Sequence, residues 1–366
     1  MNVLVAPDKF KGSLDAHNVA ENIAAGVRAV LPDANVVTIP IADGGDGTAD
    51  VISRACEGEP VNCRAHDANG REIEASYVWL ADRATAVMEM SAAAGLWRIA
   101  PGERDLLRAD TFGVGEMIKD AVRRNAREIL IGLGGSATND GGFGMARALG
   151  FQFLANEHEI ESPVELGNLA RIKAPLQKLP ATITAAVDVR NPLLGPRGAT
   201  RTFGPQKGAT PEQLEILEQR LAHLAAIVAR DLGRDLRDVP GAGAAGGLGF
   251  GLMNFCGATV KSGFEVVAEF IELRTAIAEA DIVITGEGRL DEQSLEGKAP
   301  VGVARLAREA GKRVFAIAGS ASDTPAVRKL FDGVVVLARG PVSPSESIAR
   351  AAELLQERAA ELAGMM

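Results

Sequence analysis

Three glycine-rich segments carry acidic, hydroxyl or basic side chains beside their glycines, a composition that suits a loop binding an anion. They are residues 42–48 (ADGGDGT), 134–142 (GGSATNDGG) and 285–289 (TGEGR). Glycine permits φ > 0 and lets a ligand approach backbone N–H groups, and a helix that follows such a loop adds its dipole. Turns between strands and helices also need glycine for structural reasons, so a single loop of this kind is weak evidence. The recurrence in three loops is what favours an anion-binding site.

Charged residues cluster after two apolar runs that predict strands, at residues 3–6 and 282–285. The first run continues into APDKFKGS (6–13) with Asp8, Lys9 and Lys11, and the second into Glu287 and Arg289. In a flavodoxin-like sheet of order 2-1-3-4-5, the first and third strands are neighbours, and ligands bind at their carboxyl ends. We therefore expect acidic and basic groups to converge there. The structural alternative for Asp8 is a carboxylate that forms a turn or caps a helix.

Two further residues lie in the middle of the chain. Asp188 ends an apolar run in AAVDVRNP (185–192), and Lys207 stands among glycines in FGPQKGA (203–209). An aspartate at a strand end is a candidate general base or metal ligand, with a turn-forming role as the structural alternative.

Several common motifs are missing or out of place. GAGAAG (241–246) matches GxGxxG but does not follow a strand, as a dinucleotide-binding turn must. The four histidines share no spacing and no GxSxG precedes a helix, so zinc chemistry and hydrolase triads lack support. Residues 241–260 carry no charge, but their many glycines favour a buried loop and short helix over a membrane span.

The elements that must position these residues alternate as strands and helices. Five short apolar runs predict parallel strands, at residues 3–6, 36–39, 282–285, 314–318 and 334–337. The interval between the second and third runs is far too long for one crossover connection. We therefore predict a discontinuous flavodoxin-like α/β domain, residues 1–75 and 275–366, with a second α/β domain inserted at 76–274.

The predicted insert has its own pattern. Residues 73–80 and 84–90 predict a hairpin, 113–122 a helix and 129–133 a buried strand. Capping residues open two further helices, at Thr210 and at Ser343, and the second is expected to run as one helix with Ile348 on its apolar face.

The composition limits the partners. The net charge of the 366-residue chain is −9, which argues against nucleic acid or an anionic membrane as a partner. Three cysteines without CxxC spacing and the lack of a signal-peptide pattern at the N-terminus favour a cytoplasmic protein. Small molecules are the expected ligands.

Seven runs spread along the whole chain resemble the bacterial glycerate kinase family of the type that makes 2-phosphoglycerate. They are APDKFKGSL (6–14), ADGGDGT (42–48), IGLGGSATNDGG (131–142), NPLLGPRGAT (191–200), FGPQKGAT (203–210), PGAGAAGGLGFG (240–251) and TGEGRLDEQSLEGKAPVGVA (285–304). The resemblance implies a flavodoxin-like domain with an inserted α/β domain, and transfer of the γ-phosphate of ATP to D-glycerate with Mg²⁺, in a monomer or homodimer.

The resemblance also implies roles for residues. Asp188 would act as base or metal ligand, Lys11 and Arg289 would hold phosphate or carboxylate, and Asp43 and Glu287 would lie near Mg²⁺, in a cleft between the domains. Substrate or nucleotide contacts are expected from Asp8, Lys9, Ser13, Gly44, Gly45, Gly134, Gly135, Ser136, Thr138, Asn139, Asp140, Lys207, Gly286, Gly288 and Lys298. Phosphoryl transfer depends mainly on positioning and charge neutralisation, which suits these residue types.

Two other classes of function stay open at this point. A non-catalytic sensor of nucleotides or phosphorylated metabolites would keep the same loops without turnover. A dinucleotide-dependent oxidoreductase is the weaker alternative because its glycine motif lacks the preceding strand.

Overall fold

The computed structural model describes residues 1–156, 158–291, 298–322, 324–339 and 343–366. The chain forms two compact units. Unit 1 consists of residues Met1–Asp43, Asp50–Cys56 and Ser262–Met366, and unit 2 of Gly44–Ala49 and Glu57–Lys261. Residues 292–297, which belong to the run 285–304, lie outside the described residues.

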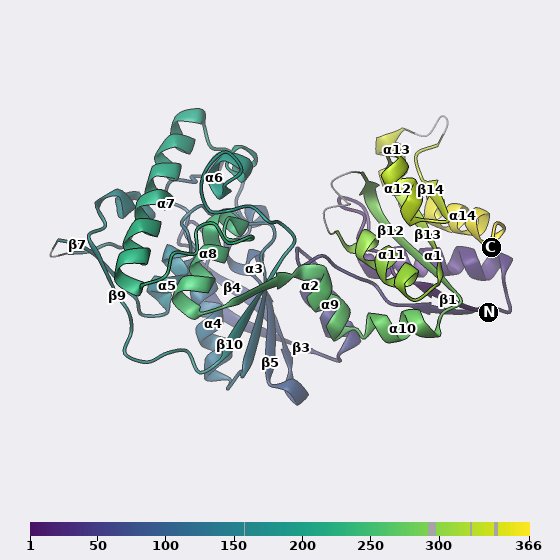
Figure 1. The fold of residues 1–366 in the computed structure, drawn as a ribbon, viewed down its shortest axis with the longest axis horizontal. Coiled ribbons are helices and arrows are strands. Elements are labelled where there is room, and N and C mark those ends of the chain that lie inside the picture. The colour runs from purple at the N-terminus through teal and green to yellow at the C-terminus, as the bar shows by residue number, and fades with distance from the viewer. Residues whose placement is uncertain (157, 292–297, 323, 340–342) are drawn as a thin grey trace. The chain divides into compact units, whose positions relative to one another are not determined.

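Unit 1 is built on a five-stranded parallel sheet (Figure 1). Its strands are β1 (Asn2–Val5), β2 (Asn35–Thr38), β12 (Ile282–Leu290), β13 (Arg313–Ala321) and β14 (Gly333–Val336). They lie in the order β14-β13-β12-β1-β2 and pair in parallel throughout. Numbered along the unit, this is the flavodoxin-like order 2-1-3-4-5, so the predicted fold class is confirmed.

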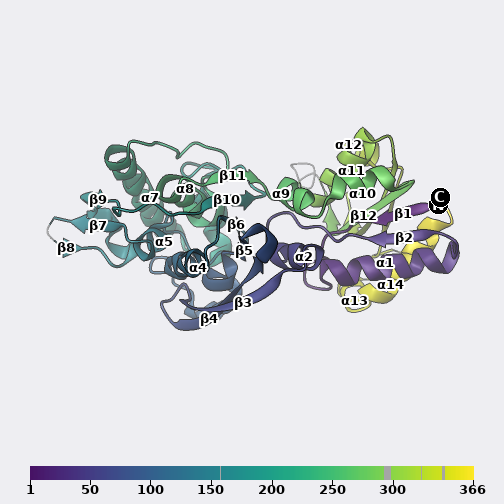
Figure 2. The same cartoon turned by 90° about the horizontal axis from the view of Figure 1, so that it is seen from below.

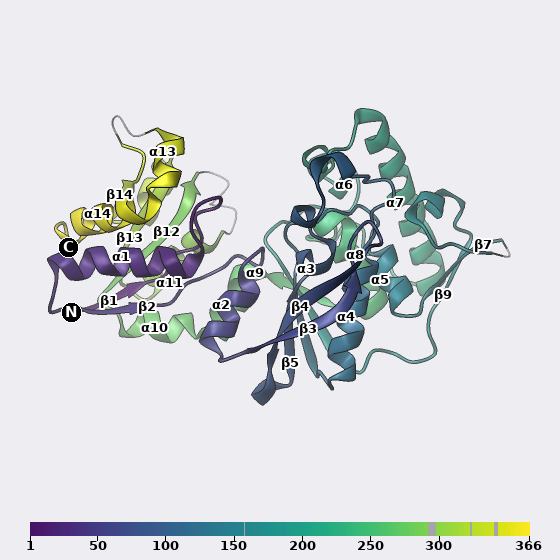
Figure 3. The same cartoon turned by 180° about the vertical axis from the view of Figure 1, so that it is seen from behind.

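Helices cover both faces of this sheet. The helices of the unit are α1 (Ala16–Val30), α9 (Gly263–Phe270), α10 (Leu273–Glu279), α11 (Ala299–Glu309), α12 (Pro325–Leu330), α13 (Pro344–Ala349) and α14 (Ala351–Ala363). Figure 2 shows α1 and α14 side by side on one face of the strands, with α10 and α11 on the other. Both chain termini lie at one end of unit 1 (Figure 3).

The C-terminal helix differs from the prediction. Ser343 caps its start by accepting a hydrogen bond from the Glu346 N–H, as expected, but the helix ends at Ala349 and a second one begins at Ala351. Arg350 has non-helical dihedral angles between them. Ile348 is 50 % exposed, whereas Leu355 and Leu362 of α14 are buried.

Unit 2 holds a six-stranded mixed sheet. Its strands are β3 (Glu59–His66), β4 (Glu72–Leu80), β5 (Thr85–Glu89), β6 (Glu128–Gly132), β10 (Thr182–Val187) and β11 (Thr259–Ser262), in the order β11-β10-β6-β5-β4-β3. The predicted hairpin is the antiparallel pair β4–β5, and β5, β6 and β10 run parallel. The sequence assigned residues 57–75 to the discontinuous domain, whereas β3 pairs along its length with β4 of this sheet.

The remaining elements of unit 2 surround this sheet. They are α3 (Ser91–Ala94), α4 (Phe112–Arg123), α5 (Phe143–Ala148), α6 (Ala199–Phe203), α7 (Pro211–Leu232), α8 (Ala244–Cys256), a small sheet of β7 (Gln152–Ala155), β8 (His158–Glu159) and β9 (Arg171–Lys173), and 3-10 turns at Ala81–Arg83, Leu96–Arg98, Pro101–Glu103, Pro163–Asn168 and Pro205–Lys207. Thr210 and Gln213 form the predicted capping box of α7. Helix α2 (Thr48–Ala55) spans residues of both units.

The segment at 241–260 is neither a membrane span nor a dinucleotide turn. Within α8, residues Ala245, Gly246 and Gly247 have positive φ, so a left-handed turn interrupts the helix. Among the described residues, no helix has the length and hydropathy that crossing a bilayer requires.

Candidate functional site

In unit 1 the two charged segments meet at the carboxyl ends of β1 and β12. The Asp8 N–H donates to the Gly286 carbonyl oxygen at 2.8 Å, and the Thr285 hydroxyl donates to the Ala6 carbonyl oxygen at 2.7 Å. These bonds continue the pairing of β1 with β12 beyond the end of β1. Residues 285–289, predicted as a turn after the third strand, instead lie within β12. The sheet therefore brings the segment after β1 beside the second half of β12, at the topological switch point, where open α/β sheets bind ligands.

Three carboxylates interact electrostatically there, and we call them the unit 1 cluster: the charges of Asp43 and Glu287 both act on Asp8. Asp8 and Glu287 are both only 7 % exposed. Burial, the largest cause, together with the negative charges of Asp43 and Glu287 raises the pKa of Asp8 to about 8, against the opposing charge and N–H of Lys9. Buried like charges of this kind are stable only if a proton or a cation neutralises them.

The basic residues predicted for this site differ in their placement. The Lys298 ammonium lies 3.9 Å from the Glu287 carboxylate, at the start of α11. Lys11 is exposed. Arg289 is also exposed and forms an ion pair with Asp291 at 2.9 Å. Ser13 donates its hydroxyl to the carbonyl oxygen of Ile348 at 3.0 Å. Lys298 thus lies beside Glu287, the positive charge of Lys9 acts on Asp8, and the hydroxyl of Ser13 binds the backbone of the C-terminal segment.

Backbone packing accounts for the glycines in the 285–289 segment. A Cβ at Gly286 would overlap the carbonyl oxygen of Ile317 on the neighbouring strand β13. A Cβ at Gly288 would lie 3.3 Å from the backbone nitrogen of Lys11. These glycines therefore let the ends of β12 and β13 and the loop after β1 approach closely.

In unit 2 the carboxyl ends of β5, β6 and β10 form one edge of the sheet. Glu89, the last residue of β5, lies opposite Gly132, the last of β6, and Gly132 lies opposite Ala186 of β10. Asp188 follows β10 directly and is exposed. The parallel register thus places Asp188 at the same edge as the glycine-rich loop after β6.

Two of the glycine-rich segments pack on each other at this edge, and we call residues 44–49 with 132–142 the unit 2 loop pair. A Cβ at Gly132 would lie 2.7 Å from the Gly44 carbonyl oxygen, and one at Gly134 would lie 2.7 Å from the Gly45 Cα. Gly135 has φ of +63° beside the Asp46 carboxylate. Only glycine allows two backbones to approach this closely.

The side chain of Glu89 binds backbone N–H groups of the first loop, residues 44–49. One of its carboxylate oxygens accepts hydrogen bonds from the N–H groups of Gly47 at 2.9 Å and Ala49 at 3.0 Å, at the start of α2. Ser91 donates to the Asp46 carboxylate at 3.0 Å. The N–H groups at this helix start therefore already serve an internal anion. Sequence reasoning missed Glu89, although its place at a strand end was a usable signal.

The side chain of Lys207 is buried against the second loop of the pair, residues 132–142. Its side chain is 4 % exposed, and its ammonium donates to the Ser136 hydroxyl and the Thr138 carbonyl oxygen, both at 2.7 Å. Desolvation lowers the pKa of Lys207 to about 7, with a smaller opposing effect from the Asp140 charge. No described residue accepts the third N–H of this ammonium, so that donor is available to a ligand.

Two further buried polar atoms lie in the same loop. The Thr138 hydroxyl and the Asn139 side-chain oxygen are buried, and neither has a hydrogen-bond partner among the described residues. The Asn139 amide nitrogen donates to the Thr200 hydroxyl at 3.0 Å. Buried polar atoms without partners are rare in native proteins and point to a bound ligand or water.

Asp140 has an internal role. It is fully buried, and its carboxylate accepts the N–H groups of Gly142 and Gly144 and both the N–H and the hydroxyl of Thr111. Burial raises the pKa of Asp140 against these bonds. The carboxylate therefore ties the loop to the starts of α4 and α5.

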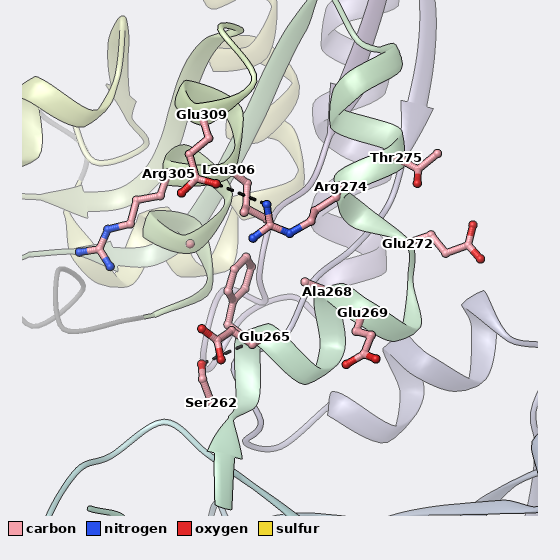
Figure 4. A pocket seen from close by; sticks show the side chains of 12 residues that line it. Ser262, Glu265, Ala268, Glu269, Glu272, Arg274, Thr275, Arg305, Leu306 and Glu309 are labelled. Atoms are coloured by element: carbon pink, nitrogen blue, oxygen red, sulfur yellow. Dashed lines mark hydrogen bonds and ion pairs between the residues drawn. The ribbon is translucent and has the colours of Figure 1, made fainter.

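A separate hollow lies in unit 1 between α9, α10 and α11 (Figure 4). It has a volume of about 840 Å³, with Phe264, Ala268 and Leu306 among its lining residues. Its rim carries four glutamates and two arginines, of which Arg274 pairs with Glu309 at 3.3 Å. None of the residues selected from the sequence lines it, and its excess of negative charge does not suit an anionic substrate.

Comparison with known proteins gives a consistent result. A sequence model of the glycerate kinase family matches residues 3–366. The chain is 43 % identical to a glycerate kinase of Haemophilus influenzae (87 % of this chain, 86 % of the relative) and 42 % identical to a glycerate 2-kinase of Escherichia coli (88 % and 86 %). A Bacillus subtilis glycerate kinase is 40 % identical, with 99 % of this chain and 97 % of the relative covered.

A crystal structure from Salmonella typhimurium LT2, of a protein assigned as a glycerate kinase 2, is also similar. It superimposes with a TM-score of 0.87 at 39 % identity, covering 100 % of this chain and 98 % of the other. Sequence and structure agree over the full length, and the chain belongs to the glycerate kinase family.

Proposed function

We propose that this protein transfers the γ-phosphate of ATP to the 2-hydroxyl of D-glycerate with Mg²⁺. Membership of the glycerate kinase family supports phosphorylation of glycerate. The observation that carries the nucleotide part of the proposal is Lys207, a buried ammonium with a spare donor among the glycines of the unit 2 loop pair. A charged donor shielded from water and aimed by two fixed hydrogen bonds is suited to bind a phosphate oxygen.

Asp188 is the proposed general base. Its exposed carboxylate would take the proton of the glycerate hydroxyl, the oxygen would bond to the γ-phosphorus, and the bond from that phosphorus to the β–γ bridging oxygen would break and release ADP. The position of Asp188 at the carboxyl edge of β10 supports this role. That the groups of the two units share one cleft stays a prediction.

The unit 1 cluster fits a magnesium ion. Carboxylate oxygens are the ligands that Mg²⁺ prefers, and it is usually held by one or two carboxylates together with water and substrate phosphates. The charges that raise the pKa of Asp8 are those of Asp43 and Glu287, the two residues predicted for the metal. No three described His, Cys, Asp or Glu residues are grouped to enclose an ion, so water and phosphate would complete the coordination. When bound, the ion would neutralise charge on the phosphates.

Replacing Asp43 with Asn or Glu287 with Gln should raise the Mg²⁺ concentration for half-maximal activity by roughly tenfold or more, because each change removes a charged oxygen ligand. The KM for D-glycerate should change much less. A Mg²⁺ titration at saturating ATP and D-glycerate measures this. Glu265→Gln, on the rim of the separate hollow, is the matched control. Unchanged Mg²⁺ dependence in both cluster variants would remove these residues from the metal site.

Lys207 should make nucleotide binding dependent on pH. Its pKa of about 7 means that the ligand-free protein loses this charge above neutrality, whereas a bound phosphate favours the protonated form. Affinity for ATP should therefore fall by up to about tenfold per pH unit between 7.5 and 9, where the nucleotide itself no longer titrates. Calorimetric titrations at several pH values in this window measure the slope.

Lys207→Met is the control for that slope. It should weaken ATP binding by roughly 10- to 100-fold near neutrality, as expected for loss of a charged hydrogen bond, and its remaining affinity should be nearly independent of pH. An equal slope in wild type and variant would show that another group titrates.

Release of ADP tests the proposed function as a whole. Mixing the protein with ATP, Mg²⁺ and D-glycerate should release ADP at a rate that depends on all three. A nucleotide sensor would bind ATP without D-glycerate-dependent release. An oxidoreductase would instead change NAD(P)H fluorescence with D-glycerate present.

A further inference from the structure

One aromatic side chain of unit 2 is both exposed and held in place. Trp97 is 68 % exposed, and no other aromatic residue in the described part of the chain has comparable exposure. The Arg98 guanidinium lies 4.4 Å from the centroid of its ring. Arg98 is itself anchored, donating to the carbonyl oxygens of Ala92 at 2.7 Å and Glu74 at 3.2 Å.

Gly95 lets the indole fold back onto its own chain. A Cβ there would lie 2.7 Å from the Trp97 ring nitrogen and would overlap the Ser91 carbonyl oxygen. The ring is thus restrained by Arg98 and the backbone at Gly95, while most of its surface is open to solvent. An exposed, restrained aromatic ring of this kind suits a planar ligand, because little side-chain entropy is lost on binding.

The backbone that carries Trp97 pairs with the candidate nucleotide loop. Gly95 and Ser136 form an antiparallel bridge. The Leu96 N–H donates to the Gly135 carbonyl oxygen at 2.8 Å, and the Ala137 N–H donates to the Ala94 carbonyl oxygen at 2.9 Å. The same hydrogen bonds therefore position Trp97 and Ser136, whose hydroxyl accepts from Lys207.

We infer that Trp97 is the stacking platform for the nucleobase of the phosphate donor. This rests on the proposed function, because it needs a nucleotide whose phosphates lie at the unit 2 loop pair. A base would stack on the open surface of the indole. The ring itself is held by the cation–π contact with the Arg98 guanidinium. Stacking accepts any base, so ATP and GTP should bind with similar affinity.

The test compares ATP with tripolyphosphate, which has the phosphates without the base. Trp97→Ala should raise the Kd for ATP by roughly tenfold or more and leave the Kd for tripolyphosphate unchanged. Trp97→Phe should retain most of the ATP affinity. In a Trp79→Phe background, where Trp97 is the only tryptophan, ATP should quench the fluorescence and tripolyphosphate should not.

Three outcomes would overturn the inference. Equal weakening of both ligands by Trp97→Ala would mean that the residue supports the loop, and ATP binding without quenching would place the base elsewhere. Self-association that Trp97→Ala abolishes, with ATP affinity unchanged, would make the indole a protein contact. If the wild-type protein binds ATP and turns over, these results count against the stack alone. If it binds neither ligand, the proposed function fails together with the stack.

Discussion

Asp188→Asn should lower kcat by about 10²- to 10⁴-fold, the range expected for losing a general base. The KM for ATP and for D-glycerate should change little, because the amide keeps the shape and loses only the ability to take a proton. Steady-state rates of ADP release at saturating substrates measure the effect. Since Asp188 is exposed, the variant should unfold at the same urea concentration as the wild type.

Asp82→Asn is the matched control for that experiment. Asp82 is also an exposed aspartate of unit 2, but it lies just before β5, at the amino edge of the same parallel strands. It should have wild-type kcat. A near-normal kcat in Asp188→Asn, or an equal loss in both variants, would exclude Asp188 as the base.

Gly246→Ala should destabilise unit 2 by about 2–5 kcal/mol. The residue has φ of +67°, which costs a side chain about 1–2 kcal/mol, and its Cβ would overlap the Thr138 carbonyl oxygen, which adds about 1–3 kcal/mol of overpacking. Because that oxygen also accepts from Lys207, ATP affinity should fall as well. Urea unfolding followed by circular dichroism, with ATP binding by calorimetry, measures both effects.

Gly257→Ala separates the two costs. Gly257 ends the same helix with φ of +68°, and a Cβ there would meet open space. It should cost only the about 1–2 kcal/mol of backbone strain and leave ATP affinity unchanged. Equal destabilisation by the two substitutions would contradict the packing of Gly246 on Thr138.

Local patterns were sufficient to predict the sheet of unit 1. Its strands are short apolar runs bounded by turn residues, and the flavodoxin-like order follows from their number and parallel direction. The boundary at residue 75 did not follow from such patterns, because β3 belongs with β4 through long-range pairing that no local signal reports. The break at Arg350 is similar, since helical periodicity continues across it.

The candidate site was predictable where residues follow strand ends. The register of parallel strands brings Asp8 near Glu287, and Asp188 to the edge of Gly132. The contacts of the loops were not predictable, because they depend on which backbones meet. Gly134 is needed for close packing of loop on loop, whereas the sequence suggested ligand contact for it. Gly246 packs in the same way on Thr138. The place of Glu89 at a strand end was a usable signal, but its hydrogen bonds to the loop are known only from the folded structure. The same is true of the exposure of Trp97.

The phosphorus NMR spectrum of the reaction mixture tests the central claim most directly. With ATP, Mg²⁺ and D-glycerate, the γ-phosphate signal should be replaced by a phosphomonoester signal split into a doublet by the single proton on C2. A triplet would show coupling to the two protons of C3 and therefore transfer to the 3-hydroxyl. Loss of the γ-phosphate to free phosphate alone, or no loss at all, would contradict glycerate phosphorylation by this protein.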